Sequence, residues 1–270
     1  MKLLPGQLIY SRKSAFHTIE ITQSEETLLL RTDQHAVQSV LSLNHPEQLN
    51  LPYMHAMIVG LLFQLSKPQN ILMLGLGGGD LLRYLHHYLS ESRVTAVEID
   101  PAMVDVCREY FALPKSKNIK IKIDDAMHFI SKSTQCYDMI MLDIYHGTSV
   151  PTVLHNQDFY QYCSDRLSEN GMLILNLLTN DADIFKHILW VLREQFDRST
   201  LCLSVPQHMN IVVFAFKQRP TDLRLEILQA KAEKLSKQYK LNFSEWVTQL
   251  FSTNPTVDGE LIFELPPTES

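Results

Sequence analysis

The stretch ILMLGLGGGDLLRYL, residues 71–85, decides the fold of this chain. An apolar run of strand length leads directly into Gly75, Gly77, Gly78 and Gly79, and a pattern of helical spacing follows. A glycine-rich turn between a strand and a helix lets a ligand approach the main chain and meet the free N–H groups of the helix N-terminus. The stretch therefore predicts a strand, a ligand-binding turn and a helix. A tight turn with a purely structural role is the alternative.

Further apolar runs follow this turn and predict a mostly parallel sheet. The first five strands are separated by segments of helical length, which is typical of β-α-β units with helices on both faces of the sheet. Only PQHM, residues 206–209, joins the last two runs, and so short a link permits a hairpin but no helical crossover. We therefore expect the final strand to be antiparallel. The predicted strands are residues 71–76, 93–100, 118–124, 137–144, 171–178, 200–205 and 210–216.

Segments of different character flank this α/β region. Residues 7–43 alternate strand-like runs with polar breaks and predict a small antiparallel sheet. A helix is expected over residues 51–63, and two more helices from Thr221 onward, the second starting at Asn242 with Glu245 in a capping pattern. We predict a small β domain over residues 1–50, a nucleoside-binding α/β domain over 51–218 and a C-terminal helical extension over 219–270.

Composition narrows the class of protein. The chain has 270 residues, 45% of them hydrophobic, and a formal net charge of −6, which argues against a nucleic-acid partner because such binding relies on clustered Lys and Arg. No apolar run reaches the roughly 18 residues of a membrane helix, and the N-terminus lacks a secretory signal, so we expect a cytoplasmic protein without a membrane partner. Its four cysteines form no CxxC pair, so no metal is expected.

Acidic residues follow the carboxyl ends of three predicted strands. Glu98 lies about 20 residues beyond the glycines, where a carboxylate can accept hydrogen bonds from both hydroxyls of a ribose. Asp124 and Asp125 follow the third strand, and Asp143 follows the fourth. Because the carboxyl ends of parallel strands share one edge of the sheet, these side chains should converge on one nucleoside-binding crevice. For Asp124 the alternative is an N-cap of the helix that begins at Ala126.

In their order, these motifs resemble those of the spermidine synthase family of polyamine aminopropyltransferases. The resemblance covers roughly residues 5–216 and is carried by YMHAM, LGLGGGD, AVEIDPAMVDVCREYF, IDDAMHFI, YDMIMLDIYHG and DFYQYCSDRLSENG. It implies an α/β protein with a class I methyltransferase-like Rossmann fold, that is, a seven-stranded sheet with its last strand antiparallel, and a small N-terminal β domain. A homodimer is implied as well.

The resemblance also implies roles for the residues that match the family's motifs. Glu98 would hold the ribose of a donor derived from S-adenosylmethionine, Asp125 the adenine amino group, and Asp143 would stand beside the acceptor amine. Tyr53 matches the Tyr of a Tyr-His-Glu or Tyr-Gln-Glu motif, and Gln7 lies near a substrate-facing Gln. The candidate donor-binding residues are Gly75, Gly77, Gly78, Gly79, Glu98, Asp124, Asp125 and Ala126. The candidate substrate-binding residues are Gln7, Tyr53, Asp80, Tyr145 and His146.

Three positions depart from the family's pattern. The family's glycine run is GGGDG or GGGEG, whose acid binds the amine of the aminopropyl arm; the aligned residue here is Gly78, and Asp80 comes two residues later. His146 stands where the family has the second acid of an Asp-x-x-Asp motif. Tyr53 is followed by a Met-His pair. The identity of the acceptor amine therefore stays open.

The expected chemistry is aminopropyl transfer, in which an amine attacks the carbon beside a sulfonium. A protonated alkylamine, with a pKa of about 10, has no lone pair, so a carboxylate must attract it and help remove its proton; Asp143 is the candidate. We expect decarboxylated S-adenosylmethionine as donor and a small amine such as putrescine as acceptor. One alternative is methyl transfer from intact S-adenosylmethionine, whose carboxylate Gly78 would not repel, with His146 as base. The other is a non-catalytic nucleoside-binding protein.

Overall fold

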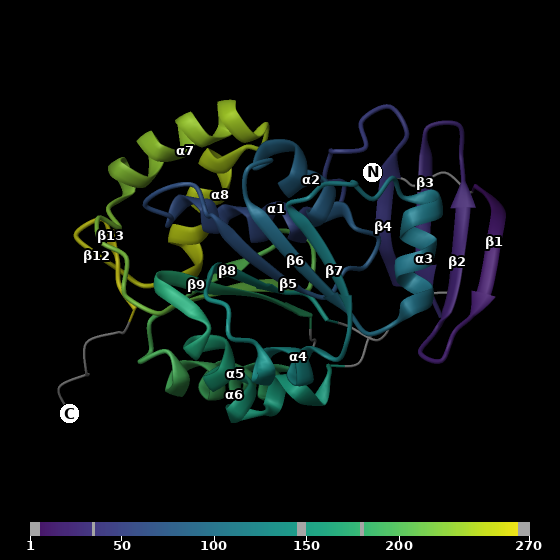
Figure 1. The fold of residues 1–270 in the computed structure, drawn as a ribbon. Coiled ribbons are helices and arrows are strands. Elements are labelled where there is room, and N and C mark those ends of the chain that lie inside the picture. Colours follow the sequence, from purple (N-terminus) through teal and green to yellow (C-terminus); the bar gives the residue numbers. More distant parts are fainter. Residues whose placement is uncertain (1–5, 34–35, 145–149, 179–180, 264–270) are drawn as a thin grey trace.

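The computed structural model describes residues 6–33, 36–144, 150–178 and 181–263. Its centre is a seven-stranded sheet in the order β10-β11-β9-β8-β5-β6-β7 (Figure 1). Within this sheet the strands β5 to β9 pair in parallel, and β11 is antiparallel to both of its neighbours. This arrangement confirms the predicted fold class. The strands are β5 (Asn70–Leu74), β6 (Arg93–Glu98), β7 (Ile119–Ile123), β8 (Tyr137–Leu142), β9 (Leu167–Leu178), β10 (Thr200–Ser204) and β11 (Asn210–Phe216).

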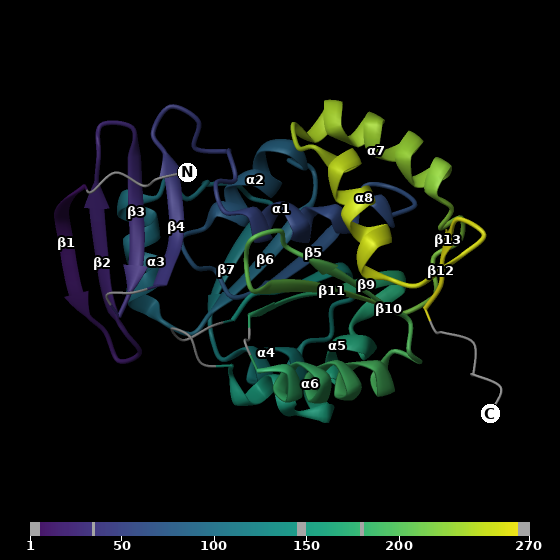
Figure 2. The same cartoon turned by 180° about the vertical axis from the view of Figure 1, so that it is seen from behind.

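Helices cover both faces of this sheet (Figures 1 and 2). One face carries α1 (Pro52–Ile58), which continues as the short 3-10 helix η1 (Val59–Leu62), together with α2 (Asp80–Tyr88), α3 (Pro101–Tyr110), α7 (Leu225–Tyr239) and α8 (Phe243–Thr253). The opposite face carries α4 (Ala126–Lys132), α5 (Gln157–Asp165) and α6 (Ala182–Gln195), with the 3-10 helix η2 (Thr152–His155) before α5.

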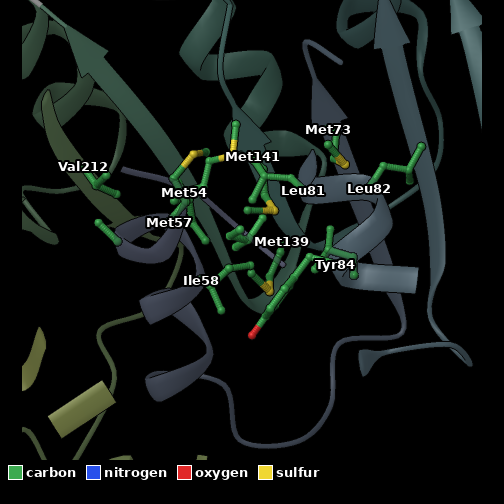
Figure 3. Close-up of a cluster of buried hydrophobic side chains, with 14 of the residues drawn as sticks. Met54, Met57, Ile58, Met73, Leu81, Leu82, Tyr84, Met139, Met141 and Val212 are labelled. Atoms are coloured by element: carbon green, nitrogen blue, oxygen red, sulfur yellow. The ribbon is translucent and has the colours of Figure 1, made fainter. Parts of the chain in front are cut away.

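Side chains alternate between the two faces along each strand and build two apolar cores. Met73 and Met141 point into the core beneath α1 and α2, whereas Leu74 and Leu142, the next residue of each strand, point into the core beneath α4, α5 and α6. Figure 3 shows the first core, in which methionines from α1, β5 and β8 gather against α2. The central strands are thus buried on both sides, as their continuous apolar runs predict.

The N-terminal segment forms a separate four-stranded antiparallel sheet, as predicted. Its strands are β1 (Gln7–Lys13), β2 (Thr18–Gln23), β3 (Thr27–Thr32) and β4 (Ala36–Ser42). The buried side chains Ile19 and Leu30 belong to the same apolar core as α2 and α3. Ser14 Oγ also donates a 2.6 Å hydrogen bond to Asp100 Oδ2 at the start of α3. The small sheet is therefore fixed against the helices that follow β5 and β6.

The C-terminal segment packs beside β10, away from the small sheet (Figure 2). Asn242 caps α8 by accepting a bond from Glu245 N, as the capping pattern predicts. Asn254, just after α8, pairs with the backbone of Cys202 on β10 through a 2.8 Å and a 2.6 Å hydrogen bond, so it covers part of that edge strand. A short hairpin of β12 (Thr256–Val257) and β13 (Glu260–Leu261) follows, which the sequence did not predict. The domain boundaries at residues 50 and 218 stay a prediction.

None of the helices within the described ranges combines the length and the apolar character that crossing a membrane requires.

Candidate functional site

A cavity of about 240 Å³ opens at the carboxyl ends of β5, β6, β7 and β8, facing the small sheet. Glu98, Asp124, Asp125 and Asp143 all line it, and the described lining residues include no Lys or Arg. The three acidic strand ends thus converge on one crevice. Four carboxylates with no Lys or Arg among the described lining residues produce a negative potential, which favours a cationic ligand.

The glycine turn forms one wall of this cavity. Gly75 has φ +98°, and a Cβ on this residue would overlap the backbone carbonyl of Asp143, so only glycine allows the ends of β5 and β8 to lie so close. Gly77, with φ +53°, lines the cavity, and a Cβ there would make only an ordinary 3.9 Å contact with the carbonyl oxygen of Gln38. Gly78 and Gly79 lie outside the lining residues, because Gly78 faces Ser39 of β4 and Gly79 faces Leu113. Gly79 is the left-handed N-cap of α2.

Glu98 is held in place by the backbone at the end of β6. Its Oε2 accepts a 3.1 Å bond from Leu76 N, and its Oε1 accepts a 3.0 Å bond from Asp100 N. Burial raises the pKa of Glu98, and these N–H donors partly oppose the effect because they stabilise the charged form. Each carboxylate oxygen keeps a further lone pair, so the side chain can still accept hydrogen bonds from two hydroxyls.

The turn after β7 places two more carboxylates at the cavity. Asp125, not Asp124, is the N-cap of α4, and its Oδ1 accepts a 2.9 Å bond from His128 N. Asp124 Oδ1 instead accepts from Asp125 N and lies 2.8 Å from His128 Nδ1. Asp124, Asp125 and Ala126 all line the cavity, so the residue that caps α4 also forms part of the cavity wall. Among the described residues, the second carboxylate oxygen of Asp125 has no hydrogen-bond donor, so it can accept a hydrogen bond from a ligand.

Asp143 directly follows β8, and two side chains of the described residues donate hydrogen bonds to it. Asn176 on β9 donates a 2.8 Å bond to Oδ1, and Tyr53 on α1 donates a 3.1 Å bond to Oδ2. Burial raises the pKa of Asp143, the two donors oppose this rise, and the charge of Asp80 adds to it. Asn210 on β11 donates a 3.0 Å bond to Asn176 Oδ1, which leaves the amide nitrogen of Asn176 facing Asp143. A carboxylate with a raised pKa is a stronger base than an exposed one.

The other predicted substrate-binding residues are spread more widely. Asp80 is the first residue of α2 and is buried beside Arg83, outside the cavity lining. Gln7 is exposed at the start of β1 and is not among the lining residues either. Tyr145 and His146 lie outside the described residues, so their predicted roles stay predictions.

Sequence reasoning missed several lining residues. His17, Thr32 and Gln38 reach the cavity from the small sheet. Met54, Met73 and Met141, which Figure 3 labels in the buried cluster, are among the apolar residues that line it. Asn176 was missed too, although an amide inside the apolar run GMLILNLL is a visible signal. A buried polar side chain in a central strand needs a hydrogen-bond partner, so its position predicts a neighbour such as Asp143.

Comparison with known proteins places this site in a family. The model of the spermine/spermidine synthase domain matches residues 51–219. A polyamine aminopropyltransferase of Neisseria meningitidis serogroup A is 31% identical over 252 residues, which cover 93% of this chain and 95% of that protein. The chain belongs to the spermine/spermidine synthase family. This finding confirms the resemblance that the motifs indicated.

Solved structures agree with the family's fold. A probable spermidine synthase from Corynebacterium glutamicum superposes with a TM-score of 0.74 at 21% identity and covers 95% of this chain and 99% of that one. Human methyltransferase-like protein 13, solved in complex with SAH, superposes with a TM-score of 0.64 at 27% identity and covers 70% of this chain and 93% of that one. The synthase family thus shares its α/β domain with methyltransferases, as the fold prediction expected.

Proposed function

We propose that this chain is a polyamine aminopropyltransferase, which transfers the aminopropyl group of decarboxylated S-adenosylmethionine to a small amine such as putrescine. Membership in the spermine/spermidine synthase family supports the reaction type. The acidic cavity supports the substrates, because both a sulfonium donor and an alkylammonium acceptor are cations.

The placement of Asp143 is the observation that carries this proposal. Its carboxylate lines the cavity between Tyr53 and Asn176, and burial raises its pKa. An ammonium ion beside it is attracted by the charge and loses its proton to the carboxylate, directly or through a water. The freed nitrogen then forms a bond to the carbon beside the sulfonium while the carbon–sulfur bond breaks, and methylthioadenosine leaves.

The other lining residues hold the nucleoside of the donor. Glu98 accepts hydrogen bonds from the ribose hydroxyls, and Asp125 accepts one from the adenine amino group. Gly75 and Gly77 let the donor approach the main chain, since neither presents a side chain to it. Aligning the acceptor nitrogen, the carbon and the sulfur in attack geometry contributes on the order of 7 to 11 kcal/mol to such a reaction.

The direct test is to incubate the purified chain with decarboxylated S-adenosylmethionine and putrescine and to follow spermidine and methylthioadenosine by mass spectrometry. Equimolar formation of both products is the expected result. A second incubation with intact S-adenosylmethionine is the matched control. No methylthioadenosine and no aminopropylated amine from the decarboxylated donor, with putrescine, cadaverine and spermidine each tried as acceptor, would contradict the proposal.

Methyl transfer is the second candidate, and the match to the human methyltransferase supports it. Position 78 is glycine where the family has an acidic residue. No negative charge at this position therefore repels the carboxylate of intact S-adenosylmethionine. Calorimetry with both donors separates the candidates. Tighter binding of the decarboxylated donor supports aminopropyl transfer, and tighter binding of the intact donor supports methyl transfer.

We also propose a cytoplasmic homodimer. Leu8 and Ile9 on β1, at the outer edge of the small sheet, are 52% and 39% exposed, and an unpaired sheet edge with apolar side chains favours association (Figure 1). Light scattering measures the mass directly. A monomer at micromolar concentration would contradict the dimer.

A further inference from the structure

A second groove lies on the face of the sheet that carries α4. Its volume is about 330 Å³, and it lies between α4 and β7, the strand at one edge of the seven-stranded sheet. Among the described residues, Asp124 alone lines both this groove and the acidic cavity. The groove is therefore a separate feature that lies next to the cavity.

Lysine side chains give this groove a positive charge. Lys120 and Lys122 alternate along β7 with Ile119 and Ile121, which pack against the core on the other face, so both lysines point toward α4. Lys132, the last residue of α4, lines the groove from the opposite side. Within the described ranges, none of these three ammonium groups forms an ion pair or a hydrogen bond with another residue.

Hydroxyl groups lie at the floor of the groove. Thr95 on β6 is 8% exposed and Tyr137 on β8 is 1% exposed, and Ser133 Oγ lies 3.4 Å from the Tyr137 hydroxyl. Lysines that only keep an edge strand from pairing with another chain need no such groups, because contact with solvent is enough for that role. Ammonium and hydroxyl donors that surround one space are what a multiply charged oxyanion requires.

Few acidic groups oppose this positive charge. Asp124 is the one carboxylate among the described lining residues, and its Oδ1 accepts a bond from Asp125 N and lies 2.8 Å from His128 Nδ1. Residues 115–132 contain five lysines and two aspartates, although the whole chain has a formal net charge of −6. The groove therefore attracts anions, whereas the cavity beside it attracts cations.

We propose that this groove binds a small ligand with a multiply charged phosphate group, either inorganic pyrophosphate or the diphosphate of a nucleotide. Lys120, Lys122 and Lys132 bind the phosphate oxygens as point charges, and the hydroxyl of Ser133 donates a hydrogen bond to them. Half-buried Phe129 gives the groove an apolar side for the organic part of a nucleotide. This site takes no part in aminopropyl transfer, so the inference goes beyond the proposed function.

The test is calorimetry with inorganic pyrophosphate in a buffer free of phosphate. We expect saturable binding that weakens as NaCl is added, because salt screens exposed charges. Replacing Lys120 and Lys122 together by Gln should weaken pyrophosphate binding by at least about tenfold. Both lysines are exposed, so the double variant should fold as the wild type does.

The double variant Lys234→Gln, Lys237→Gln is the matched control. It removes the same charge from two exposed lysines on α7, which lies toward the opposite edge of the sheet. Its affinity for pyrophosphate should stay within about twofold of the wild type. Absence of pyrophosphate binding to the wild type would overturn the inference, because Lys120 and Lys122 would then only protect the edge strand. An equal loss in the two double variants would overturn it too, since net charge alone would explain the binding.

Asp143→Asn distinguishes the groove from the cavity. It should leave pyrophosphate affinity within about twofold, because the change lies in the cavity. Stronger binding would overturn the inference, since the anion would then occupy the cavity from which a negative charge was removed.

Cytidine diphosphate distinguishes the two sources of the phosphate, and its base is not adenine, so it does not imitate a donor nucleoside. Tighter binding of cytidine diphosphate than of pyrophosphate assigns the groove to a nucleotide. Equal or weaker binding assigns it to inorganic pyrophosphate.

Discussion

The amide nitrogen of Asn176 lies 2.8 Å from Asp143 Oδ1 and donates a hydrogen bond to it. This contact joins β9 to the end of β8 and stabilises the charged form of the carboxylate, so it holds the pKa of Asp143 below the value that burial alone would produce. The base strength of Asp143 is therefore set by a balance in which burial and the charge of Asp80 raise its pKa and the donors Asn176 and Tyr53 lower it.

Replacing Asn176 by Leu should shift the pH dependence of the reaction. Without the donor the pKa of Asp143 rises, and because the base must be deprotonated, the acidic limb of the kcat/KM profile moves to higher pH. Asn210→Ala removes only the bond that orients the Asn176 amide and should cause a smaller shift in the same direction. A uniform loss of activity at every pH would contradict this role.

Asp143→Asn should remove the base while keeping the shape of the site. We expect turnover to fall by roughly 10² to 10⁴-fold, the range typical of general acid–base groups, while methylthioadenosine affinity stays within about threefold. Steady-state kinetics and calorimetry measure the two quantities. Tyr53→Phe, which removes the other donor to this carboxylate, should cost far less. Unchanged turnover in Asp143→Asn would assign the proton transfer to another group.

The sheet was predictable because its signal is local. Each central strand is an apolar run. The link at residues 206–209 is too short for any connection but a hairpin, so its length predicted that β10 and β11 pair antiparallel. The hairpin of Thr256–Val257 and Glu260–Leu261 was missed because two-residue strands are too short to show alternation.

Pattern reasoning predicted lining residues where they follow strand ends, and the family's motif added Tyr53 on α1. Glu98 and Asp143 were found because parallel strands bring their carboxyl ends together. His17 and Gln38 were missed, since they reach the cavity from a second sheet whose position depends on contacts between distant segments. Whether Asp124 or Asp125 caps α4 depends on the exact first residue of the helix, and sequence patterns do not locate a helix end to within one residue.

Gly75 and Gly77 should respond very differently to alanine. Gly75→Ala combines a positive φ with overlap of the Asp143 carbonyl, and we expect it to lower the free energy of unfolding by at least about 2 kcal/mol. In Gly77→Ala the added Cβ would make only an ordinary 3.9 Å contact with the carbonyl oxygen of Gln38, so we expect a cost of about 1 kcal/mol, the penalty of the left-handed backbone alone. Urea unfolding compares the two. Equal losses would show that the approach of Gly75 to Asp143 contributes nothing.

Glu98→Gln should flatten the pH dependence of stability. A carboxyl whose folded-state pKa is raised contributes stability that is fully present below its unfolded pKa of about 4.3 and is lost as pH rises through the raised value. The wild type should therefore lose stability above about pH 4.3, and Glu98→Gln should lose less over the same window. Urea unfolding at a series of pH values measures both curves, and their difference isolates Glu98 because Asp143 is common to both.

The same variant tests the ribose contact. Glu98→Gln keeps one carbonyl oxygen but loses the charge, so we expect methylthioadenosine affinity to fall by about tenfold or more. An analogue without the two ribose hydroxyls should bind wild type and variant alike, since it offers Glu98 no donor. Glu169→Gln, an exposed control, should leave both affinities and the stability curve unchanged. Equal losses for the two nucleosides would mean that Glu98 acts through Leu76 N and Asp100 N on the shape of the turn, not through the ribose.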